Sequence, residues 1–84
     1  MSKKEKLIKR FLSIPKDFTF DELVTLLAFF DYQIDTKGRS SGSRFEFINP
    51  DHRSIDIHKP HPSNVLKAYQ LRQVLDILES EGLI

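Results

Sequence analysis

Apolar residues recur at helical spacing in three parts of the chain. One stripe covers residues 3–13, and a stronger one follows Thr19, which has the spacing of a capping box with Glu22. A third runs over residues 68–81 and is followed by Gly82, the residue type that most easily adopts the left-handed conformation at a helix end. The pattern therefore predicts three helices. Their apolar positions are Leu7, Ile8, Phe11 and Leu12; Phe20, Leu23, Val24, Leu27 and Phe30; and Leu71, Val74, Leu75 and Leu78.

Apolar and polar residues alternate in three short runs between the second and third helices. The runs are residues 32–37, 43–49 and 54–58, and this period of two is typical of strands with one buried face. Short loops rich in Gly, Ser, Asn, Pro and Asp separate them, so we expect an antiparallel meander. We predict an α+β fold in two layers, with the order α-α-β-β-β-α and helices on one face of a three-stranded antiparallel sheet. The length of 84 residues allows one domain, residues 1–84.

The alternation restricts how the second and third strands can pair. Matching the phenylalanines of 43–49 with the isoleucines of 54–58 keeps all four on the core side and sets Arg44 opposite His58 on the outer face. A shift of two residues preserves the apolar face and sets Arg44 opposite Asp56 instead. A shift of one residue would expose the phenylalanines, so it is excluded. In both allowed registers Arg44 and His58 are direct or diagonal neighbours.

Composition limits the class of protein. Hydrophobic residues make up 39% of the chain and charged residues 30%, which is typical of a folded globular domain. There is no cysteine, which excludes disulfides, thiol catalysis and cysteine-based zinc sites, and which suits a reducing cytoplasm. No apolar run approaches the roughly 20 residues needed to span a bilayer, and no signal-peptide pattern opens the chain. We therefore expect a cytoplasmic protein without a membrane partner.

The net charge of +1 is the balance of strongly charged segments. Residues 1–16 hold six Lys or Arg and one Glu, a net charge of +5, whereas residues 17–35 hold five Asp or Glu and no Lys or Arg, a net charge of −5. Residues 36–44 add three bases and no acid, a net charge of +3. Such blocks are often solvated helix faces. They also suit a protein whose basic face meets a phosphate backbone and whose acidic face meets a protein partner.

Taken together, the motifs resemble those of the HicA family of toxin–antitoxin modules. The similarity covers nearly the whole chain and rests on the order and spacing of Pro15-Lys16-Asp17-Phe18-Thr19-Phe20-Asp21-Glu22-Leu23, Lys37-Gly38, Gly42-Ser43, Ile57-His58, Leu66-Lys67 and Glu81-Gly82-Leu83-Ile84. The resemblance implies a fold like the double-stranded-RNA-binding domain. It also implies mRNA cleavage in the bacterial cytoplasm and neutralisation by a HicB-like antitoxin.

One position departs from the pattern that the resemblance implies. Members of the family commonly carry a histidine directly after the Gly-Ser of the second strand, where it is taken as catalytic, and this chain has Arg44 there. Arginine has a pKa above about 12, so it cannot act as a general base at physiological pH. Its guanidinium can still hold a phosphate with two hydrogen bonds or stabilise negative charge in a transition state.

Another histidine could supply the missing chemistry. Metal-free RNA cleavage needs a base for the 2′-hydroxyl proton, an acid for the leaving 5′-oxygen and a cation for the phosphate, and histidine suits the proton steps. His52 lies in a predicted polar turn, whereas His58 is placed beside Arg44, so we predict His58 and Arg44 as the catalytic pair. His58 and His61 are three residues apart with no third ligand apparent, so we expect no metal and no cofactor. The predicted RNA-binding residues are Lys37, Arg39, Ser43, Arg44, Lys59 and His61.

Several interpretations remain open. The chain is a HicA-like ribonuclease acting on mRNA, a non-catalytic RNA-binding module of the same fold, or a protein-interaction domain that uses the acidic segment 17–35 and a sheet edge. Arg44 itself could simply screen Glu46 and Asp56 on an exposed sheet face. The segment 37–43 is rich in hydrogen-bond donors but lacks the spacing of a P-loop, so it fits a plain hairpin loop as well as a phosphate-contacting one.

Overall fold

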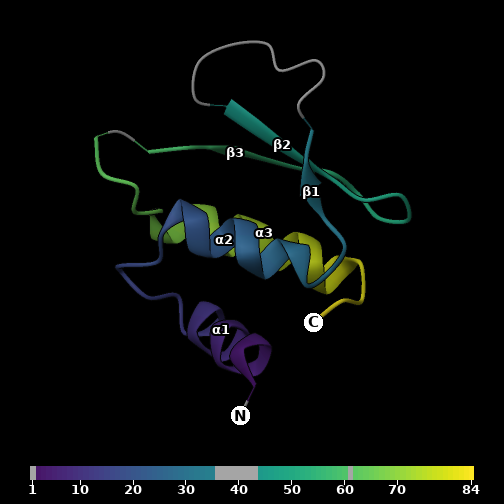
Figure 1. The fold of residues 1–84 in the computed structure, drawn as a ribbon, viewed down its shortest axis with the longest axis horizontal. Coiled ribbons are helices and arrows are strands. Elements are labelled where there is room, and N and C mark those ends of the chain that lie inside the picture. Colours follow the sequence, from purple (N-terminus) through teal and green to yellow (C-terminus); the bar gives the residue numbers. More distant parts are fainter. Residues whose placement is uncertain (1, 36–43, 61) are drawn as a thin grey trace.

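The computed structural model describes residues 2–35, 44–60 and 62–84, and Figure 1 shows their arrangement. The predicted α+β fold and its order α-α-β-β-β-α are confirmed. The elements are α1 (Lys3–Leu12), α2 (Phe20–Ala28), β1 (Gln33–Ile34), β2 (Arg44–Ile48), β3 (Ile55–His58) and α3 (Ala68–Ser80).

The three strands form an antiparallel sheet in the order β1-β2-β3, so β3 is an edge strand. The register of β2 and β3 is the first of the two that the alternation allows: Phe45 pairs with Ile57, Phe47 with Ile55, and Arg44 with His58. β1 is shorter than expected, because only two residues pair with β2. Of the rest of the predicted run 32–37, residues 32 and 35 lie outside β1, and residues 36 and 37 fall outside the described residues.

The core fills the space between the sheet and two helices, α2 and α3. Phe47, Ile55 and Ile57 point from the sheet into this layer and are at most 3% exposed. The ring of Phe20, at the start of α2, lies 5.1 Å from that of Phe45 and 6.0 Å from that of Phe47, measured between centroids. Each large apolar side chain buried in this way stabilises the fold by roughly 1.5–3 kcal/mol. Burial therefore keeps β2 and β3 oriented with their polar residues outward.

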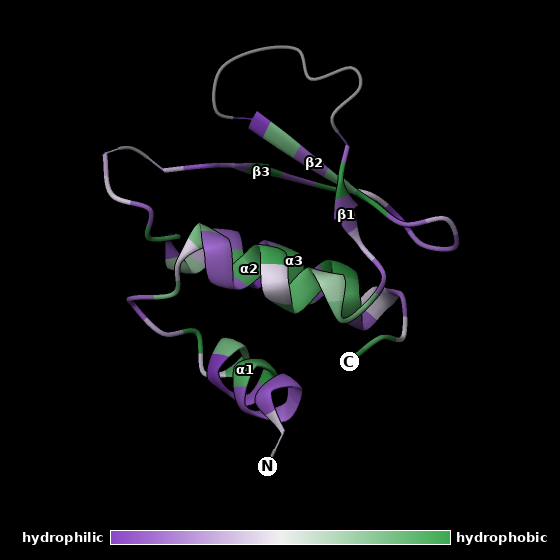
Figure 2. Cartoon of the chain, viewed as in Figure 1, coloured by the Kyte–Doolittle hydropathy of each residue, from purple (hydrophilic) through white to green (hydrophobic). Residues whose placement is uncertain are grey.

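All three helices lie on one side of the sheet, as predicted, but α1 packs against α2 and not against the sheet (Figure 1). The sheet forms one layer and α2 with α3 forms the second, as predicted. α1 adds a partial third layer. The ring of Phe11 is fully buried and lies 5.8 Å from that of Phe18. Figure 2 shows that much of the α1 ribbon is hydrophilic.

An ion pair fastens α1 to the start of α2. The Arg10 guanidinium donates to both carboxylate oxygens of Glu22, at 2.9 and 3.2 Å, and lies 3.1 Å from the Asp17 carboxylate. Glu22 also closes the predicted capping box, because it accepts the Thr19 backbone N–H while Thr19 Oγ1 accepts the Glu22 N–H. The hydrogen bond from Arg10, followed by those from Thr19, lowers the pKa of Glu22. The basic first segment and the acidic second segment thus partly neutralise each other.

The second helix ends earlier than the apolar stripe predicts, whereas the end of the third agrees with the sequence. The apolar stripe places Phe30 within the second helix, but α2 ends at Ala28 and Asp31 takes a positive φ of 67°. Gly82 has a φ of 73° just after α3, which confirms its predicted left-handed conformation.

In the part of the chain that the structure describes, no helix has the length and apolar character needed to cross a membrane.

We predict that Glu22→Gln destabilises the protein in a pH-dependent way. Glutamine can keep the capping box but cannot form the ion pair with Arg10. Because the folded-state pKa of Glu22 lies below its ordinary value of about 4.5, the stabilisation is complete above that value and is lost as the pH falls through the folded-state pKa. The melting temperature of Glu22→Gln should therefore be lower than that of the native protein at neutral pH. The gap should close as the pH falls below 4.5 and through the folded-state pKa of Glu22.

Thermal unfolding followed by circular dichroism at several pH values measures this gap. Glu79→Gln is the matched control, because Glu79 is exposed on α3 and its side chain forms no hydrogen bond or ion pair with another described residue. A gap between Glu22→Gln and the native protein that stays constant from neutral to acidic pH would contradict the role assigned to the ion pair.

Candidate functional site

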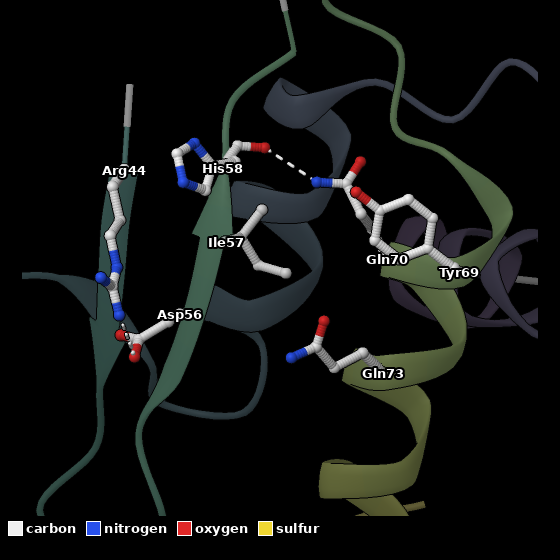
Figure 3. A pocket seen from close by; sticks show the side chains of 7 residues that line it. All are labelled: Arg44, Asp56, Ile57, His58, Tyr69, Gln70 and Gln73. Atoms are coloured by element: carbon white, nitrogen blue, oxygen red, sulfur yellow. Dashed lines mark hydrogen bonds and ion pairs between the residues drawn. The ribbon is translucent and has the colours of Figure 1, made fainter. Parts of the chain in front are cut away.

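A hollow of about 290 Å³ lies at the free edge of β3, between that strand and the start of α3. Figure 3 shows its lining, which comes from β2, β3 and α3. The polar groups of the hollow include a guanidinium, a carboxylate, an imidazole, a phenol and two amides. Its residues are Arg44, Asp56, Ile57, His58, Tyr69, Gln70 and Gln73.

Arg44 and His58, the predicted catalytic pair, meet on the outer face of the sheet. They are direct cross-strand partners, both are exposed, and Figure 3 shows both side chains on the same side of β3. The burial of Phe45 and Ile57, which follow and precede them in their strands, forces this outward orientation. The structure thus brings a permanent cation and a titratable ring together at one wall of the hollow.

Arg44 also has an acidic neighbour. Its Nη2 lies 3.3 Å from Oδ2 of Asp56, the diagonal neighbour on β3. The Arg44 and Asp56 side chains are 55% and 48% exposed, and an exposed pair of this kind contributes at most about 1 kcal/mol. The contact agrees with the screening role that the sequence left open for Arg44. Its weakness means that a phosphate group can compete with Asp56 for the guanidinium.

Gln70 is a buried residue that lines the hollow and joins its two sides. Its side chain is 5% exposed; Nε2 donates to the His58 carbonyl oxygen at 3.0 Å, and Oε1 accepts the Lys67 backbone N–H at 3.0 Å. This amide joins the end of β3 to the start of α3, as the dashed line in Figure 3 shows in part. Gln70 therefore positions the backbone of His58, while the imidazole remains on the outer face.

The structure separates the other predicted residues from this hollow or leaves them undescribed. Lys59 Nζ lies 5.5 Å from the centroid of the Phe20 ring, and Lys59 does not line the hollow. Four of the predicted RNA-binding residues fall outside the described residues: Lys37, Arg39, Ser43 and His61. Among the described residues of the predicted site, Arg44 and His58 therefore lie side by side in the hollow, and Lys59 does not line it.

His52 belongs to a different part of the molecule. Its Nδ1 lies 3.0 Å from Oε1 of Glu81, which also accepts the Arg53 backbone N–H at 3.1 Å. The bond from Arg53 and then that from His52 lower the pKa of Glu81. His52 thus ties the loop between β2 and β3 to the end of α3. Among residues 2–35, 44–60 and 62–84, no three His, Asp or Glu side chains are grouped to hold a metal ion.

Sequence reasoning missed three residues of the hollow, Tyr69, Gln70 and Gln73. Gln70 carried a usable signal, because it stands three residues after Lys67 at the start of a helix, and glutamine at this position can bond the backbone N–H of the cap residue. Tyr69 and Gln73 are exposed helix residues, so the apolar periodicity does not mark them.

Comparison with protein families identifies the family to which the chain is similar. The model of the family described as the HicA toxin of bacterial toxin–antitoxin matches residues 20–79. This range begins at the first residue of α2 and contains Arg44, His58 and the rest of the hollow, whereas α1 lies before it. Neither the search of curated proteins nor that of solved structures found a match.

We predict that Gln70→Ala lowers the free energy of unfolding by about 1–3 kcal/mol, because it leaves the Lys67 N–H and the His58 carbonyl without their partner. Urea unfolding measures the change. Gln73→Ala is the matched control, because Gln73 is exposed one turn further along the same helix and should shift the free energy by less than about 0.5 kcal/mol. Equal stabilities of Gln70→Ala and Gln73→Ala would show that the amide bridge does not hold β3 to α3.

Proposed function

The chain belongs to the HicA toxin family, and from this premise we propose that it is a ribonuclease that cleaves mRNA at the Arg44–His58 pair without a metal ion. The toxins of this family form one half of a toxin–antitoxin system. The observation that carries the proposal is the cross-strand pairing of Arg44 with His58 at the wall of the hollow. It places a group that can bind a phosphate beside a group that can move a proton.

The proposed reaction is attack of a ribose 2′-oxygen on the adjacent phosphorus. The imidazole of His58 accepts the 2′-hydroxyl proton, the new O–P bond forms, and the bond from phosphorus to the 5′-oxygen breaks. The leaving 5′-oxygen takes a proton from solvent, and the products are a 2′,3′-cyclic phosphate and a 5′-hydroxyl. The Arg44 guanidinium donates to the phosphate oxygens and stabilises the charge that develops on them.

This assignment divides the work between two side chains. The family resemblance places a catalytic histidine where this chain has Arg44, and a guanidinium cannot accept a proton at physiological pH. The role of base passes to His58, the direct partner of Arg44 across the strands. Exchange of Asp56 for a phosphate oxygen would leave the Arg44 guanidinium paired, since both are anionic acceptors.

A second candidate function is RNA binding without cleavage. The specific observation in its favour is Arg44 itself, which stands where the resemblance implies a catalytic histidine and which can bind a phosphate but cannot accept a proton. In that case Arg44 would mark the loss of the family's chemistry while phosphate binding persists. Both candidates share the proposed partners, which are mRNA and an HicB-like antitoxin in the bacterial cytoplasm.

We predict that His58→Ala lowers the rate of RNA cleavage by about 10²–10⁴-fold, the usual contribution of a general base, while RNA binding persists because Arg44 is retained. The test is cleavage of a labelled single-stranded RNA with a metal chelator present, together with anisotropy of the bound RNA. His52→Ala is the matched control, because His52 lies outside the hollow.

Three outcomes separate the candidates. Loss of cleavage with retained binding supports His58 as the base. Native-like cleavage by His58→Ala removes His58 from the mechanism. If the native protein binds RNA but does not cut it, the non-catalytic function replaces the ribonuclease.

A further inference from the structure

Tyr69 is the most exposed large apolar side chain of the described residues. It is 63% exposed in the first turn of α3, and its ring lines the hollow. Gln73 stands four residues later, so it shares that face of the helix. Figure 3 shows both side chains reaching from α3 toward the free edge of β3. Neither the Tyr69 hydroxyl nor the Gln73 amide hydrogen-bonds to another described residue.

The two sides of the hollow differ in chemistry. The side formed by β2 and β3 carries Arg44 and His58, whereas the side formed by α3 carries an aromatic ring and a free amide. A nucleotide has the same two parts: an anionic phosphate and a flat base with hydrogen-bonding groups on its edge. With a volume of about 290 Å³, the hollow is slightly smaller than most ligand sites, which run from roughly 300 to 1,000 Å³. It therefore suits one base and not a longer stretch of RNA.

We propose that this side of the hollow binds one nucleobase of single-stranded RNA, next to the phosphate at Arg44. The base stacks on the Tyr69 ring, and the Gln73 amide, which has both donors and an acceptor, bonds its edge. This inference rests on the proposed function, because it assumes that RNA occupies the hollow. It adds that Tyr69 supplies affinity for bases in general and that Gln73 distinguishes one base from another.

Gln70, the buried neighbour of Tyr69, holds the Tyr69 ring in place as a platform for a stacked base. Gln70 is held by two hydrogen bonds to the backbone at positions 58 and 67, so the first turn of α3 is fastened to the end of β3. The aromatic ring is thus carried at a set place relative to His58. A stacked base loses less freedom on a platform that is already in position.

The experiment compares two labelled oligomers that the protein cannot cut. One is a short single-stranded RNA with 2′-O-methyl groups throughout, and the other has the same backbone without bases. Fluorescence anisotropy should show that Tyr69→Ala binds the first oligomer about 5- to 150-fold more weakly than the native protein does, the usual effect of losing one stacked base. Binding of the oligomer without bases should not change. Tyr69→Phe keeps the ring and should restore the affinity.

Two further measurements complete the test. Leu12→Ala controls for the loss of an exposed apolar side chain, because Leu12 lies on α1, away from the hollow, and it should bind both oligomers like the native protein. Gln73→Ala should narrow the spread of affinities among uncleavable oligomers of A, C, G and U. An unchanged spread would overturn the role of Gln73.

The outcomes distinguish this site from the proposed function. If the native protein cleaves RNA but Tyr69→Ala binds the base-containing oligomer normally, the base site is wrong and the ribonuclease stands. An equal loss on both oligomers would also overturn base stacking, because it would show a backbone contact or a folding defect. If the native protein neither binds the uncleavable RNA nor cleaves RNA, the proposed function fails and the base site fails with it.

Discussion

The site depends on one constraint, the burial of alternate residues in β2 and β3. Because side chains of a strand alternate between faces, packing Phe47 and Ile57 against the helices turns Arg44 and His58 to the opposite face. A slip of one residue would expose two aromatic rings, at a cost of roughly 1.5–3 kcal/mol for each buried side chain. The apolar core therefore fixes which polar groups meet on the outer face, and one of its members, Ile57, also lines the hollow.

The helices add what the sheet alone lacks. α3 closes the free edge of β3 through Gln70 and brings an exposed aromatic residue to that edge, so the hollow has two chemically different sides. α1 plays a separate part: it lies before the residues that match the family, and Arg10 fastens it to Glu22 on the far side of α2. The residues of the proposed chemistry and of the proposed base contact thus all lie within the matched range, and α1 packs outside it against α2.

The sequence predicted the features that follow from local rules. The capping box at Thr19, the left-handed Gly82 and the adjacency of Arg44 and His58 each follow from residue type or from the period of two, although the period left two registers open and the structure has the first of them. The prediction that Phe30 lies within the second helix was wrong, because the apolar stripe continues past the end of the helix while the chain turns at Asp31 to begin the sheet. Tyr69 could not be found either. It lines the hollow only because α3 returns beside β3, and no local pattern of residues indicates such a contact between distant segments.

The end groups of the cleaved RNA test the central claim most directly. The native protein is incubated with a single-stranded RNA in the presence of a metal chelator, and the fragments are analysed by mass spectrometry. Attack by the 2′-oxygen, with His58 as base and Arg44 on the phosphate, predicts fragments that end in a 2′,3′-cyclic phosphate and begin with a 5′-hydroxyl. Fragments that begin with a 5′-phosphate, or cleavage that stops when the chelator is added, would contradict the account.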